Sequence, residues 1–395
     1  MKKMYAIFAG MLLTASAANA QCYPVKKTAD VTYSTVYNLT MDIYTPIGSP
    51  ATKRPVLIMA HGGSFSGGSK AENTSTEIAR RFASRGYTTA SINYRLESST
   101  LNLTDSNVAA GAVMRAVGDM KAAVRFFRKD AAGANLYLAD TNTVYVGGNS
   151  AGAITAVNLA YLNDSLEAPV YIRSQIATNG GVDGNSGNPG YSSKVSGVLN
   201  FAGGVKDTFW INAGEPKVFS AHGDADKTVP YDYDNVLNAL TGNGALATTI
   251  TLFGSGAMKH RLDKVGVTNV LKTYVGADHV PWESDVNIFK EIDSLSAVFL
   301  GAPTCFELGL STGIEEVEAS QISLYPNPAN NVLNITAETP IRTIRIVDQL
   351  GREVETKNVA ATTTTISVAN FSKGIYVANL QMQSGANITK KFVVE

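Results

Sequence analysis

The sequence has little of what charge-driven or metal-dependent proteins need. Its 33 lysines and arginines balance its 33 aspartates and glutamates, and only 17% of its residues are charged. A chain without a positive field does not attract nucleic acid or an anionic membrane surface, so we expect neither as a partner. The sequence also has no H-E-x-x-H or C-x-x-C pattern, and we therefore expect no catalytic metal and no cofactor.

The first twenty residues differ from the rest of the chain. "MKK" supplies positive charge, "MYAIFAGMLLTASA" is apolar, and Ala18-Asn19-Ala20 forms an A-x-A site. This pattern predicts a signal peptide over residues 1–20, because the apolar run is short for a membrane anchor. The stretch 19–22 also lacks the small apolar run that precedes a lipidated cysteine. We therefore expect an exported mature chain without a transmembrane segment.

Cysteine is almost absent from the chain. Cys22 and Cys305 lie at the two ends of the region that we assign to the first domain. In an oxidising compartment these two residues are placed to form one disulfide, and two free thiols are the alternative. Neither cysteine has a nearby histidine in the sequence that would activate a thiolate, so we expect no catalytic cysteine.

Between these cysteines, apolar segments of strand length alternate with amphipathic segments of helix length. The run 55–63 is apolar and ends in glycines, which is typical of a strand buried on both faces. Alternating strands and helices predict an α/β fold with a mostly parallel sheet flanked by helices. The predicted strands are residues 39–46, 55–63, 87–96, 142–150, 195–204, 216–224 and 268–279, and the predicted helices are residues 75–86, 109–132, 151–162 and 286–301.

One serine stands at a sharp turn of this pattern. "GGNSAG" places Ser150 in a G-x-S-x-G frame between an apolar strand and an alanine-rich helix. A nucleophile at such a turn has a strained backbone, so the residues two before and two after it must be small. The amide of Ala151, at the helix N-terminus, is expected to face the negative charge that develops on a reacting carbonyl. We therefore predict that Ser150 is a nucleophile rather than part of a structural turn.

A second set of amides is expected after the first buried strand, in "AHGGSF". Gly62 and Gly63 allow the backbone to approach a ligand closely. The amides of Gly63 and Ser64 are therefore predicted to complete an oxyanion hole with Ala151. We expect His61, at the strand end, to brace this loop rather than to act as a catalyst.

A serine nucleophile needs a base and an orienting carboxylate. His279 follows the last apolar strand, and Asp226 follows the strand before it. The order Ser150, Asp226, His279 is the order in which α/β-hydrolases carry their triad. Asp224 is the alternative acid, although it stands closer to the strand. The histidines that we assign to structural or solvent-exposed positions are His61, His222 and His260.

Residues 31–301 resemble an α/β-hydrolase of the carboxylesterase kind, a group that includes feruloyl and acetylxylan esterases. The motifs that carry the resemblance are "DIYTP", "HGGSFSGGSK", "SINYRL", "GDMKAAVRFFR", "GGNSAG" and "HGDADKTVP". The resemblance implies an α/β-hydrolase fold, and it implies that Asp226 is the acid of the H-G-x-x-D-x-x-V-P loop. Ser64 stands where many relatives have the third glycine of H-G-G-G, which leaves the preference for bulky acyl groups open.

The resemblance also implies a secreted serine ester hydrolase that forms an acyl-enzyme. Its expected substrates are small aliphatic, acetyl or feruloyl esters of plant polysaccharide. The alternatives are a catalytically inactive surface-binding protein and a serine peptidase. No member of the predicted triad is missing, and prolyl oligopeptidases usually add a propeller for which this chain has no room.

The glycine- and asparagine-rich loop 177–193 lies where such folds place a lid, so it is a candidate border of the substrate cleft. A calcium site on Asp183, Asn185 and Asn188 is an alternative role for this loop. No glutamate completes that set of ligands.

The chain changes character beyond residue 301. Residues 306–321 are small, polar and acidic, which predicts a linker between a catalytic domain over 21–305 and a second domain over 322–395. In this second domain, short alternating segments separated by turns predict a small all-β sandwich without acid–base machinery.

The second domain resembles the C-terminal sorting domain of the type IX secretion system of Bacteroidota. The features that carry this resemblance are Y-P-N-P at 325–328, "DQLGREV", "FSKGIYVANL" and the late Lys-Lys-Phe. It implies the secretion machinery as a partner and export through the periplasm to the cell surface or the medium. The alternative is a carbohydrate-binding module in which Tyr325, Phe371 and Tyr376 stack on sugars.

Overall fold

A computed structural model of the chain describes residues 22–236, 250–303, 322–348, 352–383 and 387–395. The predicted signal peptide and the predicted linker lie outside these residues. The chain forms two compact units, one up to residue 306 and the other from residue 307 onward.

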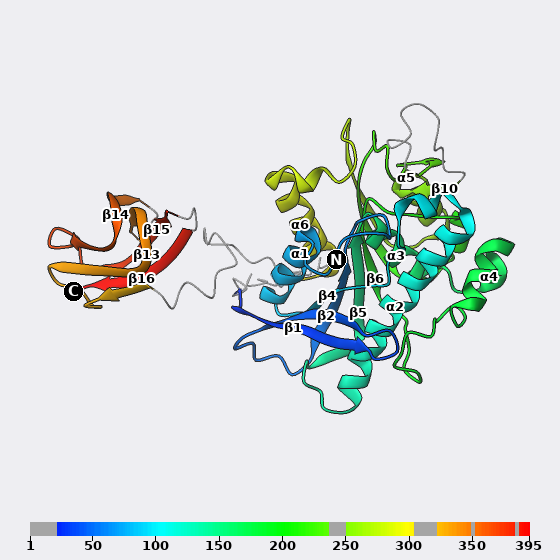
Figure 1. Cartoon of the computed structure of the whole chain (residues 1–395), viewed down its shortest axis with the longest axis horizontal. Helices are drawn as coiled ribbons and strands as arrows, with labels where there is room; N and C mark the ends of the chain where they lie inside the picture. The colour runs from blue at the N-terminus through cyan, green and yellow to red at the C-terminus, as the bar shows by residue number, and fades with distance from the viewer. Residues whose placement is uncertain (1–21, 237–249, 304–321, 349–351, 384–386) are drawn as a thin grey trace, which may run out of the picture. The chain divides into compact units, whose positions relative to one another are not determined.

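An eight-stranded sheet forms the centre of the first unit (Figure 1). Its strand order is β1-β2-β4-β3-β5-β6-β8-β11, and every pair from β4 to β11 is parallel. The two strands at the other edge pair antiparallel. The strands are β1 (Val25–Ser34), β2 (Leu39–Pro46), β3 (Arg54–Ala60), β4 (Thr88–Ile92), β5 (Ala139–Asn149), β6 (Gly197–Phe201), β8 (Lys217–Gly223) and β11 (Asn269–Tyr274).

Helices cover both faces of this sheet. The helices α2 (Ser106–Ala132) and α3 (Ala151–Tyr161) lie on one face, and α1 (Asn73–Ser84) and α6 (Val286–Leu300) lie on the other (Figure 1). Alternate side chains of β3 point to opposite faces. Ile58 therefore joins the apolar cluster of α2 and α3, while Leu57 and Met59 join the cluster of α1 and α6. The prediction of a mostly parallel sheet buried on both faces is confirmed.

Several elements were not predicted from the sequence. They are the edge strand β1, the helix α4 (Val170–Thr178), and a separate small sheet of β7 (Gly204–Val205), β10 (Thr251–Gly254) and β9 (Tyr233–Asn235). The strands of the small sheet have two to four residues, which is too short for a period to be recognised. Helix α5 (Ser255–Val265) follows β10 directly and contains His260.

The second unit is all-β, as predicted. Its five strands form one antiparallel sheet in which β13 pairs with β12, β14 and β15. Tyr376 is buried against Phe371 and Phe392, with ring centroids 5.1 Å and 5.7 Å away. Phe371 and Tyr376 therefore belong to the packing of the unit, whereas Tyr325, the third residue considered for sugar binding, is 53% exposed. The strands are β12 (Ile322–Tyr325), β13 (Val332–Val347), β14 (Glu353–Ser367), β15 (Gly374–Met382) and β16 (Asn387–Val394).

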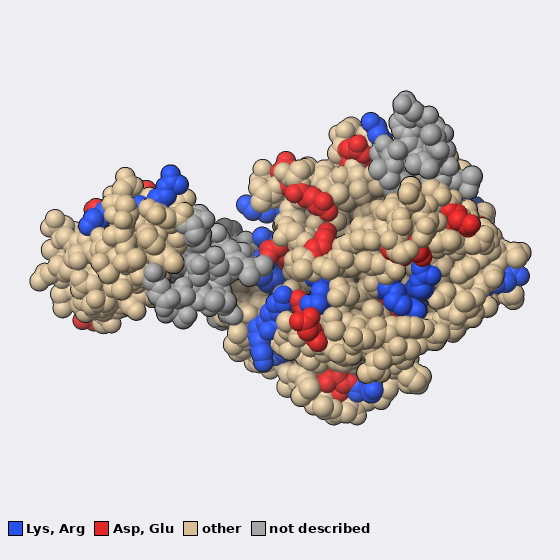
Figure 2. Space-filling model, viewed as in Figure 1, with Lys and Arg blue, Asp and Glu red and all other residues tan. Residues whose placement is uncertain are grey.

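The described residues on the face seen in Figure 2 show no large field of one charge. On the face seen in Figure 2, acidic and basic side chains are interspersed with uncharged residues, in line with the balanced composition. Within the described ranges, none of the helices combines the length and the apolar character that crossing a membrane requires.

Candidate active site

Ser150 lies at the apex of the turn between β5 and α3. Its backbone has φ 54° and ψ −117°, a conformation that is strained for a residue with a side chain. The amide of Ser150 donates to the carbonyl of Phe201 at 2.8 Å, which ties the turn to the neighbouring strand β6. The strained conformation is the one expected at the nucleophile turn of G-x-S-x-G.

The two glycines of the frame are required by close backbone contacts. A Cβ on Gly148 would lie 2.2 Å from the carbonyl carbon of Gly152, and a Cβ on Gly152 would lie 2.1 Å from the carbonyl oxygen of Ala60. Neither contact leaves room for a side chain. The glycines therefore allow α3 to begin directly against the ends of β5 and β3.

The structure brings together the three residues predicted as nucleophile, base and acid. Nε2 of His279 lies 2.8 Å from Oγ of Ser150. Nδ1 of His279 lies 2.6 Å from Oδ2 of Asp226. All three residues follow parallel strands of the central sheet, and the carboxyl ends of these strands meet at one edge. This geometry can polarise the serine hydroxyl and stabilise an imidazolium.

The carboxylate of Asp226 is fully buried and accepts several hydrogen bonds. Its Oδ1 accepts from the amides of Thr228 and Val229 at 2.8 Å and 2.9 Å. Burial by itself would raise the pKa of the Asp226 carboxyl, but hydrogen bonds from His222 and His279 outweigh it and hold this pKa well below its usual range. Asp226 is therefore an anion wherever the protein is folded near neutral pH.

The alternative acid, Asp224, lies elsewhere. It is exposed, and its Oδ1 accepts from the amide of Gly276 at 2.6 Å. Of the two carboxylates, the one in hydrogen-bond contact with His279 is that of Asp226.

The other histidines occupy different environments. His61 is buried, stacks on Tyr94 at a centroid distance of 4.3 Å, and its Nδ1 lies 2.6 Å from the carbonyl oxygen of Gly62. Burial lowers the pKa of His61. It thus braces the loop after β3, as expected, and His260 is exposed on α5. His222 was expected to be structural, but its Nε2 lies 3.2 Å from Oδ2 of Asp226, a contact that the sequence reasoning missed.

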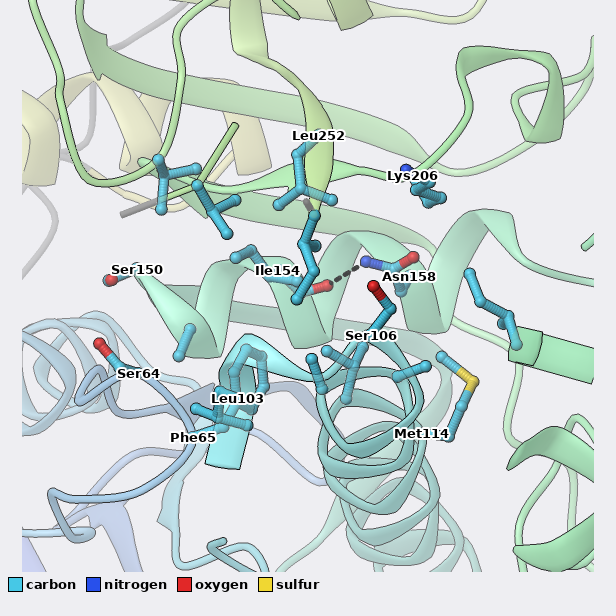
Figure 3. A pocket seen from close by; sticks show the side chains of 18 of the residues that line it. Ser64, Phe65, Leu103, Ser106, Met114, Ser150, Ile154, Asn158, Lys206 and Leu252 are labelled. Atoms are coloured by element: carbon cyan, nitrogen blue, oxygen red, sulfur yellow. Dashed lines mark hydrogen bonds between the residues drawn. The ribbon is translucent and has the colours of Figure 1, made fainter. Parts of the chain in front are cut away.

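The loop after β3 has the backbone needed to present amides. Gly63, Ser64 and Phe65 all have positive φ, at 109°, 51° and 58°. The carbonyl of Gly63 accepts from the amides of Ser66 and Gly67, which closes a tight turn. Ser64 lines the same cavity as Ser150 and Ala151 (Figure 3). Two of the three candidate oxyanion residues, Ser64 and Ala151, therefore border one space together with Ser150, whereas Gly63 is not among the residues that line it.

This cavity has a volume of about 120 Å³ and is mostly apolar. Ser150, Ile154 and Asn158 line it from α3, and their spacing of four places them on one face of the helix. Figure 3 shows the cavity following α3 away from Ser150, between this helix, α2 and β10. Its other apolar lining residues include Phe65, Leu103, Val113, Met114, Trp210 and Leu252.

The loop 177–193 is not among the described residues that line this cavity. Cations of α2 hold the loop instead: Lys121 Nζ donates to the carbonyl of Val182 at 2.8 Å, and Arg125 donates to those of Asp183 and Gly187 at 2.9 Å. The loop that was expected to act as a lid is thus bound to helix α2.

The carboxylate that was considered for calcium has partners in the protein. Asp183 accepts from Ser193 Oγ and lies 3.6 Å from Nζ of Lys121. Over the described part of the chain, no group of three His, Cys, Asp or Glu side chains is arranged to hold a metal ion.

Asn149, the first of the two variable residues of the G-x-S-x-G frame, also makes contacts that the sequence did not reveal. Its Oδ1 accepts from Nε1 of Trp282 at 3.0 Å. Its Nδ2 donates to Glu72 Oε1 at 2.8 Å and to Glu283 Oε1 at 2.6 Å. The "HVPW" segment after the last strand was the available signal, because it places a tryptophan just beyond His279.

Cys22 takes part in a disulfide. Cys305, the partner predicted for it, lies outside the described residues.

A known protein family matches a part of each of the two units. Residues 41–205 match the BD-FAE family, and residues 323–395 match the secretion system C-terminal sorting domain. The chain has a BD-FAE esterase-like domain followed by a type IX sorting domain. It is therefore an esterase-like hydrolase of the α/β-hydrolase fold, and its sorting domain directs it out of the cell, to be secreted or held at the surface.

Solved structures of an esterase from the Planctomycetes species Thermogutta terrifontis are also similar. The butyrate-bound and propionate-bound forms are each 21% identical, with a TM-score of 0.49 over 72% of this chain and 95% of theirs. The form phosphonylated by cyclosarin is 21% identical, with a TM-score of 0.49 over 71% of this chain and 93% of its own. Among curated proteins, none matches the chain.

Proposed function

We propose that this esterase-like hydrolase is a serine carboxylic-ester hydrolase in which Ser150, His279 and Asp226 form the catalytic triad. The observation that carries the proposal is the continuous hydrogen-bonded chain from Oγ of Ser150 through both nitrogens of His279 to Oδ2 of Asp226. In this chain of contacts, the buried and ionised carboxylate of Asp226 faces the base His279, and Ser150 opens onto the cavity.

In the acylation step, Oγ of Ser150 attacks the ester carbonyl carbon while Nε2 of His279 takes the hydroxyl proton. The carbonyl oxygen becomes an oxyanion, which the amide of Ala151 and the amides of Gly63 or Ser64 stabilise. Asp226 holds the imidazole with its Nδ1–H toward the carboxylate and stabilises the imidazolium. The tetrahedral intermediate collapses, its alkoxide leaves with the proton from Nε2, and an ester between Ser150 and the acyl group remains.

In the deacylation step, water takes the place of the alcohol. His279 removes a proton from the water, whose oxygen attacks the acyl carbon and forms a second oxyanion at the same amides. Collapse releases the carboxylic acid and returns the proton to Ser150. The balance is one ester and one water consumed, and one acid and one alcohol formed.

The cavity indicates the acyl side of the substrate. At about 120 Å³ it is far larger than the roughly 10–15 Å³ that one water molecule requires, so it admits more than an acetyl methyl group. Its apolar lining favours small aliphatic or feruloyl groups over charged ones. For the alcohol side, the exported location supports esters of plant polysaccharide as substrates, including acetyl esters.

The test is a panel of p-nitrophenyl acetate, p-nitrophenyl butyrate, a feruloyl ester and acetylated xylan, measured with the full chain and with Ser150→Ala. We expect hydrolysis of at least the butyryl or feruloyl ester by the full chain and a rate at least about 10³-fold lower with the variant. Equal rates for both proteins would contradict the triad. Peptide cleavage without ester cleavage would favour a serine peptidase, and inactivity on every substrate would favour a binding protein.

A further inference from the structure

His222, on β8, makes contacts that the mechanism above does not use. Its Nε2 lies 3.2 Å from Oδ2 of Asp226 and 3.0 Å from the carbonyl oxygen of Val229. Its Nδ1 lies 2.8 Å from Oγ of Ser255. The ring is fully buried. His222 therefore shares Oδ2 of Asp226 with His279, which approaches the same oxygen to 2.6 Å.

The neighbours of the two ring nitrogens determine which one carries the hydrogen. A carboxylate oxygen and a carbonyl oxygen only accept, so Nε2 of His222 is the donor and its single hydrogen is shared between the two. Oγ of Ser255 accepts from Nδ2 of Asn200 at 3.1 Å, which leaves the hydroxyl hydrogen for Nδ1 of His222. A neutral His222 with its hydrogen on Nε2 satisfies every contact from Asn200 to Asp226.

His222 and Asp226, which this contact joins, lie in different kinds of structure. His222 lies within the sheet, paired in register with Thr273 of β11, whereas Asp226 lies in the loop beyond the end of β8. The loop amides of Thr228 and Val229 hold Oδ1 of Asp226. The bond from His222 ties the other oxygen, which faces His279, to the sheet.

We propose that His222 is a positioning residue, which through Nε2–H holds the Asp226 carboxylate with Oδ2 against Nδ1 of His279. The proposal rests on the proposed function, because it assigns His222 a part in the same serine-esterase chemistry. Without this donor the carboxylate keeps its charge partner His279 and the two amides on Oδ1, but it loses the bond that ties Oδ2 to the sheet. Geometry of this kind must be held to a fraction of an ångström for efficient proton transfer.

The experiment compares His222→Phe with His222→Gln in the full chain. Phenylalanine fills the space without a donor, whereas glutamine offers an amide N–H to Asp226. Rates on p-nitrophenyl butyrate are expressed per active site, counted from the burst of p-nitrophenol that an organophosphate with a p-nitrophenyl leaving group releases when it phosphorylates the serine. We expect His222→Phe to lower kcat about 10- to 100-fold with little change in KM, and His222→Gln to recover most of this loss.

The decisive comparison uses the Asp226→Asn background. A residue that acts through the Asp226 carboxylate has little left to contribute once the carboxylate is gone, so His222→Phe should change kcat there by less than about twofold. A loss of kcat of about 10- to 100-fold in that background, or an unchanged kcat per active site in His222→Phe alone, would overturn the proposal. Fewer titratable sites or a lower Tm with normal kcat per site would show a purely structural role and overturn it as well.

Two further variants guard against misfolding. Ser255→Ala leaves the Nε2 contact in place but removes the hydroxyl that fixes the ring tautomer, so we expect a smaller loss of kcat in the same direction. If His222→Phe does not fold, Ser255→Ala in the wild-type and Asp226→Asn backgrounds supplies the same comparison.

His260→Phe, exposed on α5, is the control and should have normal kcat. Failure of the proposed function would appear separately, as full activity in Ser150→Ala.

Discussion

Nε1 of Trp282 donates a 3.0 Å hydrogen bond to Oδ1 of Asn149, the residue directly before Ser150. Trp282 belongs to the short helix η5 (Pro281–Glu283), just beyond His279, and its buried ring packs at 5.8 Å from that of Phe201. Asn149 is the last residue of β5. The contact therefore joins the loop that carries His279, the proposed base, to the strand that precedes Ser150, the proposed nucleophile.

Replacing Trp282 by phenylalanine tests this link. The change keeps most of the ring packing but leaves Oδ1 of Asn149 buried without its donor, which costs about 1–3 kcal/mol of stability. We expect a lower Tm and a kcat that falls more than KM changes, because His279 is held less firmly relative to Ser150. Thermal unfolding and steady-state kinetics measure the two effects. An unchanged Tm together with an unchanged kcat would show that this hydrogen bond contributes neither to stability nor to catalysis.

Ser150→Ala removes the proposed nucleophile. We expect a loss of about 10³-fold or more in kcat with the fold intact, because the oxyanion amides alone support only slow hydrolysis. Peptide mapping after treatment of the full chain with an organophosphate should find the label on Ser150. Ser98→Ala, at an exposed serine, is the matched control and should keep full activity and full labelling. A label on any other serine would contradict the assignment.

The two aspartates after β8 should respond differently to amidation. Asp226→Asn should lower kcat by about 10⁴-fold, because an amide favours the wrong tautomer of the base. Asp224→Asn leaves His279 untouched and should retain most of the activity, since Asp224 bonds the amide of Gly276. A larger loss at position 224 than at position 226 would reverse the choice of acid.

The pKa of Asp226 also predicts a dependence of stability on pH. Because this pKa is depressed in the folded protein, the carboxylate stabilises the fold above the ordinary aspartate pKa of about 3.9, and this contribution is lost as the pH falls toward the lower folded value. The Tm difference between the wild type and Asp226→Asn should therefore be largest near neutral pH and shrink below about pH 4. A difference that is constant over this range would contradict the depressed pKa.

The sequence predicts that Ser150, Asp226 and His279 lie close together, and the structure brings them into hydrogen-bond contact, because the rule involved is local. Ser150, Asp226 and His279 each follow an apolar strand, and parallel strands bring their carboxyl ends to one edge. The role of His222 could not be predicted in this way. It depends on how the loop after β8 folds back so that the carboxylate of Asp226 meets a ring four residues earlier.

The cavity was likewise invisible in the sequence. The α2 residues that line it, such as Val113 and Met114, have the same helical spacing as residues that pack in the core. Whether such a face fills a core or leaves a cavity depends on the segments packed against it. Here these segments include α4 and β10, two short elements with weak patterns.

Ile154→Phe tests the assignment of this cavity to the acyl group. Ile154 faces the cavity one turn beyond Ser150, so a larger side chain there shortens the space along α3. We expect kcat/KM for p-nitrophenyl butyrate to fall at least about tenfold relative to p-nitrophenyl acetate, because a group that no longer fits loses its transition-state binding. Leu136→Phe, at an exposed position, is the control and should leave the ratio unchanged. An equal loss on both esters would place the acyl group elsewhere.

Removal of the sorting domain tests the division of labour between the two units. Ser150, Asp226 and His279 lie in the first unit, and the apolar clusters of the two units share no residue. A chain of residues 21–305 retains both cysteines and should keep kcat/KM on a small soluble ester within about threefold of the full chain, or ~0.7 kcal/mol in transition-state stabilisation. In the native host it should accumulate in the periplasm, because it lacks the sorting domain.

Loss of activity on a soluble ester would show that the second unit contributes to the active site. Loss on insoluble polysaccharide alone would show that it binds substrate, although its aromatic rings at Phe371 and Tyr376 are engaged in packing.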